Sequence, residues 1–271
     1  MFAGFQTGAT YVGGGRVLLK TRNGFKMYVD SRDISIAPHL ILDGVWEEWT
    51  EAVLRQLVAP GMQVLEAGAN VGYFTLVMAR AAGPSGQVHS FECDPGLATL
   101  ARDNIEINGL HRTARVVEKA LGERPGRVTF YGTDRHRGGG SIVQGLEQIP
   151  HNPTDQRSAI DVEMTSIDAY VQGTGVQLDV LKLDAEGAEP AILRGASALL
   201  ASTRSLTIVM EFFPRFVREA GDDAAALLRS LQERRFELGV IDERQRRVVP
   251  TTAEALLARE SAELVLRRPR G

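Results

Sequence analysis

A glycine-containing turn between a short apolar run and a helical pattern is the strongest local signal of chemistry in this sequence. In VLEAGANVGYFTLVMAR, which begins at Val64, three residues separate Gly68 from Gly72. Glycines after a strand let the backbone approach a ligand beyond the carboxyl end of a sheet. The dinucleotide fingerprint also needs glycines at its third and sixth places, which are Asn70 and Tyr73 when counted from Gly68. The pattern therefore disfavours a nicotinamide dinucleotide.

Two acids accompany this turn. Glu92 ends the next predicted strand, 24 positions after Gly68, and an acid about 20 positions on accepts hydrogen bonds from ribose hydroxyls in nucleotide-binding units. Glu66, at the end of the first strand, would repel a pyrophosphate and attract a cation. S-adenosylmethionine fits, because it carries ribose hydroxyls, no phosphate and a sulfonium charge. We expect the adjacent Cys93 to be an ordinary small side chain near this pocket rather than a reactive thiol.

A second group of acids follows another apolar run, in LKLDAEGAEP. Asp184 and Glu186 precede a predicted helix, and we expect them to face the same crevice as Glu92. Glu189 lies in the first turn of that helix, where an acid is favoured by the helix dipole. We interpret Lys182, which is flanked by apolar residues, as a solvated or ion-paired lysine rather than a catalytic one.

Methyl transfer from a sulfonium to an alcohol needs an oxygen placed in line with the carbon–sulfur bond and a base for the proton. Asp184 or Glu186 is the predicted base, and His136, in a glycine-rich stretch, is the second choice. Glu211 ends a further predicted strand and either reaches the acceptor or pairs with a nearby arginine. In a weaker alternative, Asp184, Glu186 and Glu211 hold a divalent cation that polarises the alcohol, so we assign no metal ligand.

The elements that must bring these acids together are visible from Gly61 onward. Short β-rich runs alternate with helical patterns, which predicts an α/β fold with a doubly wound sheet and helices on both of its faces. The predicted strands are Gln63 to Glu66, Val88 to Glu92, Ala114 to Lys119, Val180 to Asp184, Ser205 to Glu211, Phe236 to Ile241 and Glu263 to Leu266.

The first sixty residues predict a hairpin and a helix. The hairpin joins Val17 to Lys20 and Phe25 to Val29 through an Asn-Gly turn. Apolar residues then recur at helical spacing from Val45 to Leu57, before a Pro-Gly stop. We therefore divide the chain into an N-terminal cap at 1–60 and a main domain at 61–271.

A long, less regular stretch separates the third and fourth predicted strands. It contains Gly138-Gly139-Gly140 and His151-Asn152-Pro153, and it is too polar and too rich in turn formers for the core. Long loops in compact domains are commonly functional, so we predict an active-site loop here.

Together these motifs resemble the FkbM family of S-adenosylmethionine-dependent methyltransferases, a branch of the class I methyltransferase fold. The resemblance runs from Gly44 to Ala196 and rests on GVWEEW, VLEAGANVGYFT, FECDP with the later Asn104 and Asn108, KALGE, and LKLDAEGAE through LRGA. The Asp-Ala-Glu-Gly-Ala-Glu segment narrows it to this family. Glu66 stands where the family often has Asp.

The resemblance implies a Rossmann-like class I sheet and methyl transfer to a hydroxyl, commonly on a sugar, a polyketide or another secondary metabolite, with S-adenosylhomocysteine as product. Some similar proteins methylate nitrogen. A nicotinamide-dependent oxidoreductase is the enzyme alternative, weakened by Asn70. A non-catalytic S-adenosylmethionine-binding protein is the other alternative, favoured only if Asp184 and Glu186 lie far from the methyl group.

The resemblance also implies roles for particular residues. Glu92 would hold the ribose, and Asp184 and Glu186 would sit by the transferred methyl. The remaining implied contacts are Glu66, Gly68, Asn70, Gly72 and Tyr73 at the methionine end, and Lys119 and Ala120 at the adenine. Apart from the resemblance, Trp46, Glu47 and Ser141 are candidates for contact with the acceptor, although the helical spacing of Trp46 and Trp49 favours a place in the core.

Composition is that of an ordinary globular protein, since 44% of its 271 residues are hydrophobic and 24% are charged. A net charge of -3 gives no field that would draw nucleic acid or an anionic membrane. Cys93 is the single cysteine, which favours a reducing compartment. No apolar run approaches a membrane span, and the N-terminus lacks the features of a secretory signal. We expect a cytoplasmic protein that acts on a small molecule; a homo-oligomer is compatible with this composition.

Overall fold

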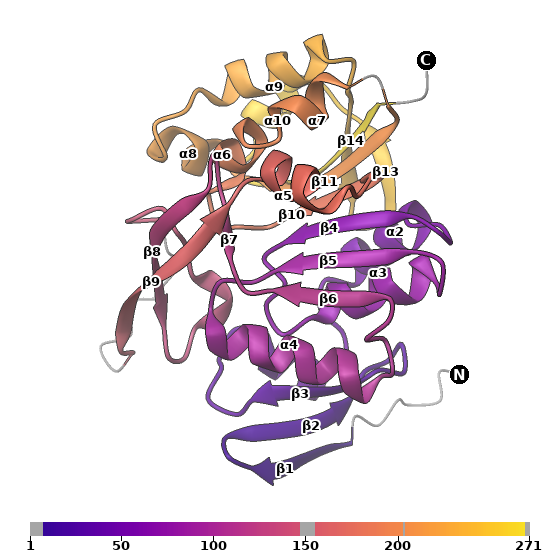
Figure 1. Ribbon diagram of the computed structural model, residues 1–271, viewed down its shortest axis with the longest axis vertical. Helices are drawn as coiled ribbons and strands as arrows, with labels where there is room; N and C mark the ends of the chain where they lie inside the picture. Colours follow the sequence, from indigo (N-terminus) through magenta and orange to yellow (C-terminus); the bar gives the residue numbers. More distant parts are fainter. Residues whose placement is uncertain (1–7, 147–154, 203, 269–271) are drawn as a thin grey trace.

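The computed structural model describes residues 8–146, 155–202 and 204–268. Its centre is an eight-stranded sheet with the order β13-β12-β14-β11-β10-β4-β5-β6 (Figure 1). Five neighbouring strands run parallel: β11 (Leu206–Phe212), β10 (Val180–Leu183), β4 (Gln63–Ala67), β5 (Gln87–Phe91) and β6 (Ala114–Val117). Antiparallel pairing adds β14 (Ala262–Arg268), β12 (Glu237–Asp242) and β13 (Arg247–Pro250). The predicted doubly wound α/β sheet is confirmed.

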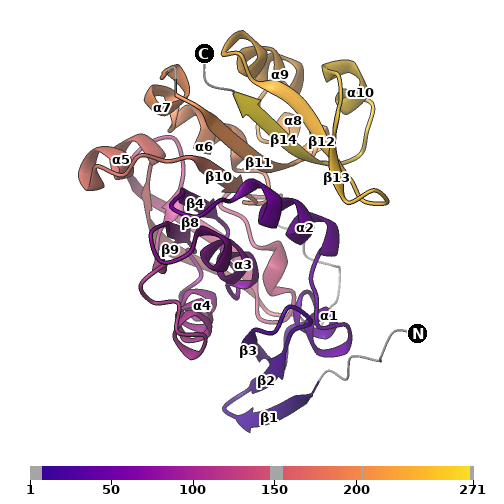
Figure 2. The same ribbon diagram turned by 90° about the vertical axis from the view of Figure 1, so that its right-hand side faces the viewer.

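Successive residues of the central strands enter two different apolar cores, because side chains alternate between the faces of a sheet. In β4, Val64 joins one core and Leu65 the other, and in β10 Val180 and Leu181 divide in the same way. The first core is covered by α2 (Glu48–Leu57), α3 (Tyr73–Ala82) and α4 (Pro95–Ile107), seen together in Figure 2. The second is covered by α5 (Ile167–Thr174), α6 (Glu189–Arg194), α7 (Ser197–Ala201), α8 (Pro214–Glu219), α9 (Ala224–Glu233) and α10 (Ala253–Leu257).

A three-stranded antiparallel sheet of β1 (Ala9–Gly13), β2 (Arg16–Lys20) and β3 (Lys26–Asp30) lies beside α4 (Figure 1). The predicted hairpin corresponds to β2 and β3, and β1 is an additional strand. Asn104 of α4 joins this sheet to the main one: its side chain accepts a hydrogen bond from Tyr28 N at 2.6 Å and donates to Tyr28 O and to Val71 O. The chain continues through α1 (Ala37–Leu42) into α2, which ends at Leu57 as expected.

The stretch predicted to be a long loop is largely a second small sheet. β8 (Gly126–Thr133) and β9 (Arg157–Thr165) pair antiparallel, and β7 (Ala120–Leu121) joins β9. Most β9 side chains are at least partly exposed, so its sequence lacks the apolar character from which strands were predicted. Gly138 and Gly139 belong to a 3-10 turn (Arg137–Gly139), and Gly140 is its C-cap. His151-Asn152-Pro153 lies outside the described residues.

Candidate active site

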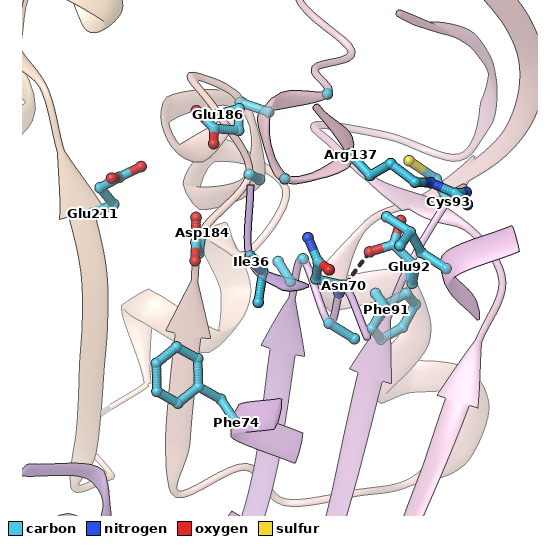
Figure 3. A pocket seen from close by; sticks show the side chains of 18 of the residues that line it. Ile36, Asn70, Phe74, Phe91, Glu92, Cys93, Arg137, Asp184, Glu186 and Glu211 are labelled. Carbon is cyan, nitrogen blue, oxygen red and sulfur yellow. Dashed lines mark hydrogen bonds between the residues drawn. The ribbon is translucent and has the colours of Figure 1, made fainter. Parts of the chain in front are cut away.

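A cavity of about 450 Å³ lies beyond the carboxyl ends of β4, β5, β10 and β11, where ligands of doubly wound sheets bind. Figure 3 shows Asp184, Glu186 and Glu211 on one side of it, and Glu92 and Cys93 on the other. The predicted site residues that line this cavity are Trp46, Glu47, Gly68, Asn70, Tyr73, Glu92, Cys93, Lys119, Ala120, His136, Asp184, Glu186 and Glu211. Glu66, Gly72 and Ser141 are not among the lining residues.

The glycine turn after β4 brings two strand ends into contact. A Cβ at Gly68, whose φ is +79°, would lie 1.8 Å from the carbonyl oxygen of Asp184, so no larger residue fits there without moving backbone. Asn70 also has a positive φ, and its side-chain oxygen accepts a hydrogen bond from Val71 N. The turn therefore places the glycine-rich backbone directly beside the acidic end of β10.

Glu92 joins two loops at the floor of the cavity. One carboxylate oxygen accepts a hydrogen bond from Asn70 N and the other from Asp94 N, each at 2.8 Å (Figure 3). Burial raises the pKa of Glu92 to about 7, although these backbone donors act in the opposite direction. Because each oxygen has a second acceptor site, this carboxyl retains the capacity to accept hydrogen bonds from a ribose.

Two predicted cofactor residues lie behind the cavity instead of on its surface. Glu66 is fully buried, and its carboxyl accepts hydrogen bonds from Thr75 Oγ1 and Ser90 Oγ. Alternation along β4 directs it to the face covered by α3, so the expectation that it lines the methionine end is wrong. Gly72 is needed for packing, because a Cβ there would lie 3.3 Å from Ala101 of α4.

Cys93 is a partly buried thiol, as expected for an ordinary small side chain. Burial, followed by the charges of Glu92 and Asp94, raises its pKa well above the usual value. A thiol held in this way is a poor nucleophile at neutral pH. Lys119, at the adenine side of the predicted site, forms an ion pair with Glu163 at 2.8 Å.

Ser141 supports the site without lining it. Its hydroxyl donates a hydrogen bond to the carbonyl oxygen of Glu186 at 2.7 Å, and the residue is almost completely buried. Glu186 has a φ of 49°, which is uncommon outside glycine and asparagine. The expectation that Ser141 contacts the acceptor is therefore corrected to a role in holding the backbone of Glu186.

Asp184, Glu186 and Glu211 converge from β10, the following loop and β11. One carboxylate oxygen from each residue lies within 4.8 Å of the other two. Oxygen ligands in this arrangement suit a hard divalent cation, and they suit equally a group that donates hydrogen bonds. This convergence, at the ends of two predicted strands, is the one that the sequence offered as its weaker alternative.

Lys182 pairs with one of these three acids, Asp184, from the buried side of the cavity. Its Nζ lies 2.7 Å from Asp184 Oδ2 and 4.7 Å from the centre of the Phe74 ring, and it is almost fully buried. Burial alone lowers the pKa of a lysine, but the charges of Asp184 and Glu66 raise this one above its usual value. The ion-paired interpretation of Lys182 therefore holds, and it places Lys182 beside the predicted base.

The acids of the cavity differ in their affinity for protons. Burial, and then the charges of Asp184 and Glu186, raise the pKa of Glu211 to about 11. Glu47, whose backbone is left-handed at a φ of 41°, has its pKa raised to about 7 by burial and by Asp184. Glu211 therefore carries a proton at neutral pH, whereas Asp184 forms an ion pair with Lys182.

Arg137, which the sequence did not single out, borders the cavity on the side of Glu92 and Cys93 (Figure 3). Its guanidinium lies 3.2 Å from Asp30 Oδ2 and 2.7 Å from Asp94 Oδ1, and its side chain is 14% exposed. The adjacent Gly138 N donates a hydrogen bond to Ser35 Oγ. We call this group, made of Asp30, Arg137 and Asp94, the arginine clamp. It joins the N-terminal sheet, the 3-10 turn and the start of α4 across the cavity.

Comparison with known proteins agrees with this arrangement. The model of the Methyltransferase FkbM domain matches residues 66–238. The 2-O-methyltransferase NoeI of Sinorhizobium fredii is 27% identical over 167 residues, which cover 56% of this chain and 66% of that protein. A protein-L-isoaspartate O-methyltransferase of Methanothrix thermoacetophila is 52% identical over 46 residues, covering 17% of this chain and 22% of that protein.

The match to the protein-L-isoaspartate O-methyltransferases spans between 22% and 32% of their length. Among solved structures, an O-methyltransferase from Bacillus cereus in complex with SAH has a TM-score of 0.48 and 16% identity, covering 86% of this chain and 85% of that one. The FkbM model spans the glycine turn, Glu92, the acids after β10 and Glu211, and the chain belongs to the FkbM methyltransferase family.

Proposed function

We propose that this protein transfers the methyl group of S-adenosylmethionine to a hydroxyl of a small molecule, such as a sugar, a polyketide or another secondary metabolite. The observation that carries the proposal is the meeting of two kinds of site in one cavity. Glu92 and the glycine turn occupy one side, and Asp184, Glu186 and Glu211 occupy the other. The first suits an adenosyl group, and the second suits an alcohol that must lose a proton.

The residues present fit S-adenosylmethionine. Glu92 is available to the ribose hydroxyls, Gly68 and Asn70 border the methionine end, and Lys119 and Ala120 border the adenine. These side chains present no cluster of basic residues for a pyrophosphate. When bound, S-adenosylmethionine would supply a methyl group activated by its sulfonium, which would pass to the acceptor oxygen with S-adenosylhomocysteine as the leaving group.

Positioning and proton removal fall to the acids. An acceptor oxygen held between Asp184 and Glu186 would lie beside a side chain that is paired with Lys182. A correctly placed base contributes about 10² to 10⁴ in rate. Glu211, protonated at neutral pH, is suited to donate a hydrogen bond and not to accept the proton. His136 lines the same cavity and remains the second choice of base.

We further propose that residues 1–60 act as a cap on the catalytic domain at 61–271. Ile36, His39, Trp46 and Glu47 from this region line the cavity, so the cap would select the acceptor. We propose a cytoplasmic location. Among the described residues, none of the helices has the length and apolar character needed to cross a lipid bilayer.

The test has two stages. Titration calorimetry of the full-length protein with S-adenosylmethionine, S-adenosylhomocysteine and NAD should show binding of the first two alone; binding of NAD in their place would contradict the proposal. A screen of hydroxylated acceptors should then give acceptor-dependent formation of S-adenosylhomocysteine. Mass spectrometry of the product identifies the methylated atom. If that atom is nitrogen, the proposed cofactor is right and the proposed hydroxyl acceptor is wrong. Cofactor binding with no turnover on any acceptor would favour a non-catalytic binding protein.

A further inference from the structure

The loop after β10, residues 184–189, has a backbone conformation that residues other than glycine rarely adopt. We call it the acid loop. Within it, Glu186 has a φ of 49° and Gly187 a φ of 93°. Of the five residues other than glycine with positive φ in the described chain, three line the candidate active site: Glu47, Asn70 and Glu186. Such strained backbone persists only where the surrounding structure holds it, and it gathers at functional sites.

Glu189 holds the acid loop from within. Besides lying in the first turn of α6, as expected, its side chain turns back toward β10. Its Oε1 accepts a hydrogen bond from Ala185 N at 2.6 Å, and its Oε2 accepts one from Gly187 N at 3.0 Å. These two amides belong to the residues immediately before and after Glu186. Glu189 is only 5% exposed, so its carboxyl serves the loop and not the solvent.

A second support comes from the segment that follows the 3-10 turn. Ser141 Oγ donates a hydrogen bond to the carbonyl oxygen of Glu186 at 2.7 Å. The backbone of Ser141 is itself fixed to β8, because it exchanges two hydrogen bonds with Tyr131, at 2.8 and 2.9 Å. Leu146 of the same segment packs against Gly187, where an added Cβ would lie 2.5 Å from Leu146 Cδ1. The acid loop is therefore held from two independent directions.

Together these contacts fix the backbone of Glu186 and leave its side chain at the cavity. The amides of its two neighbours bond to Glu189, and its own carbonyl oxygen bonds to Ser141. Figure 3 shows the Glu186 side chain on the same side of the cavity as Asp184 and Glu211. Functional side chains need supports of this kind, because they must be held within about 0.5 Å of the productive geometry.

We propose that Glu189 and Ser141 are positioning residues that hold the carboxyl of Glu186 beside the place of the transferred methyl group. This inference rests on the proposed function and deepens it. Neither positioning residue is among those that line the cavity, so each acts through Glu186 and takes no part in the bond changes. Ser141 lies between β8 and β9, so a part of the chain outside the main sheet helps to build the acidic side of the site.

The test uses sinefungin, an analogue of S-adenosylmethionine in which a carbon bearing an amino group replaces the methylated sulfur. Its ammonium occupies the place of the transferred methyl group, where S-adenosylhomocysteine has no group at all. Both compounds are titrated by calorimetry into the full-length protein at neutral pH. If Glu186 is held beside that place, sinefungin is expected to bind at least about fivefold more tightly than S-adenosylhomocysteine, because a carboxylate attracts the ammonium.

Variants assign this preference to the acid loop. Glu186→Gln is expected to remove most of it. Ser141→Ala and Glu189→Gln are each expected to lower the preference to about twofold, with little change in the affinity for S-adenosylhomocysteine. Two matched controls should keep the full preference: Ser166→Ala, a buried serine that caps α5, and Glu254→Gln, an exposed acid in the first turn of α10. If Glu189→Gln does not fold, Ser141→Ala alone decides.

A double variant separates positioning from a general structural role. In the Glu186→Gln background, Ser141→Ala is expected to leave the remaining ratio of affinities unchanged, because its effect passes through Glu186. A further change in that ratio would contradict the inference, and so would a full preference in Ser141→Ala. Absence of S-adenosylhomocysteine binding in the unmodified protein would overturn the proposed function together with this inference. Binding of S-adenosylhomocysteine without a preference for sinefungin would overturn this inference alone.

Discussion

The Nζ of Lys182 lies 2.7 Å from Oδ2 of Asp184, two residues further along the chain at the end of β10. The lysine is buried, and the aspartate side chain is 33% exposed at the cavity. The pair therefore fixes the Asp184 side chain from the core of the sheet while leaving part of it accessible at the proposed site of methyl transfer.

Asp184→Asn and Glu186→Gln are each expected to slow turnover by about 10² while changing cofactor affinity little, because they remove a proton acceptor and retain the shape of the site. Steady-state kinetics with the best acceptor, together with calorimetry of S-adenosylmethionine, measures both effects. Glu237→Gln is the control for an exposed acid. Full activity in both site variants would remove these acids from the chemistry.

Glu92→Ala is expected to weaken binding of S-adenosylmethionine by about 1.5 to 3 kcal/mol, the usual contribution of hydrogen bonds to a charged group. Part of the loss would come from Asn70 N and Asp94 N, which would lose their acceptor. Calorimetric titration gives the affinity directly. Unchanged affinity would refute the ribose assignment.

The free energy of unfolding is expected to fall as the pH rises from about 6.5 to about 8.5. A carboxyl whose folded pKa is raised keeps a proton that the unfolded chain has lost, so the native state binds more protons between the two values. Burial raises the pKa to about 7 for Glu92 and Glu189, about 8 for Glu263 and about 11 for Glu211.

The lower limit of this window is set by His89. Burial lowers its pKa from 6.5 to about 4. Between these two values the unfolded chain binds the proton and the folded chain does not, so His89 makes the free energy of unfolding rise with pH. Above about pH 6.5 this increase has ended, and only the carboxyls change the stability. Urea denaturation at a series of pH values measures the trend. Glu211→Gln should show a smaller decline than the unmodified protein. Stability that increases across this window would show that these carboxyls are ionised in the native state.

Arg137→Ala is expected to release S-adenosylhomocysteine about tenfold faster, because the arginine clamp ties three segments across the cavity and its loss removes two ion pairs. Stopped-flow displacement of bound S-adenosylhomocysteine measures the rate. Arg127→Ala is the control: it changes an exposed arginine on β8, the strand that precedes the 3-10 turn, and it should leave the rate unaltered. Equal rates in both variants would show that the clamp does not retain the cofactor.

The local sequence was sufficient to predict the parallel strands and the residues at their ends. The parallel strands were predictable because apolar runs bounded by turn residues allow few other structures, and the positions of Gly68, Glu92 and Asp184 followed from where those strands end. The beginning of α4 is also local in origin, because the Asp94 side chain accepts hydrogen bonds from Gly96 N and Leu97 N and Pro95 follows it.

Tertiary structure decided which side chains enter the cavity and what each one meets there. Glu66 and Lys182 are neighbours in register on β4 and β10, yet the sequence could not say that Glu66 would face α3. Ser141 and Arg137 acquire their partners from segments distant in the chain. The opposition of Glu211 and Glu263 depends on β14 inserting between β11 and β12. Sequence patterns record burial and local turns, whereas such contacts depend on strand order and on which face of the sheet each residue occupies.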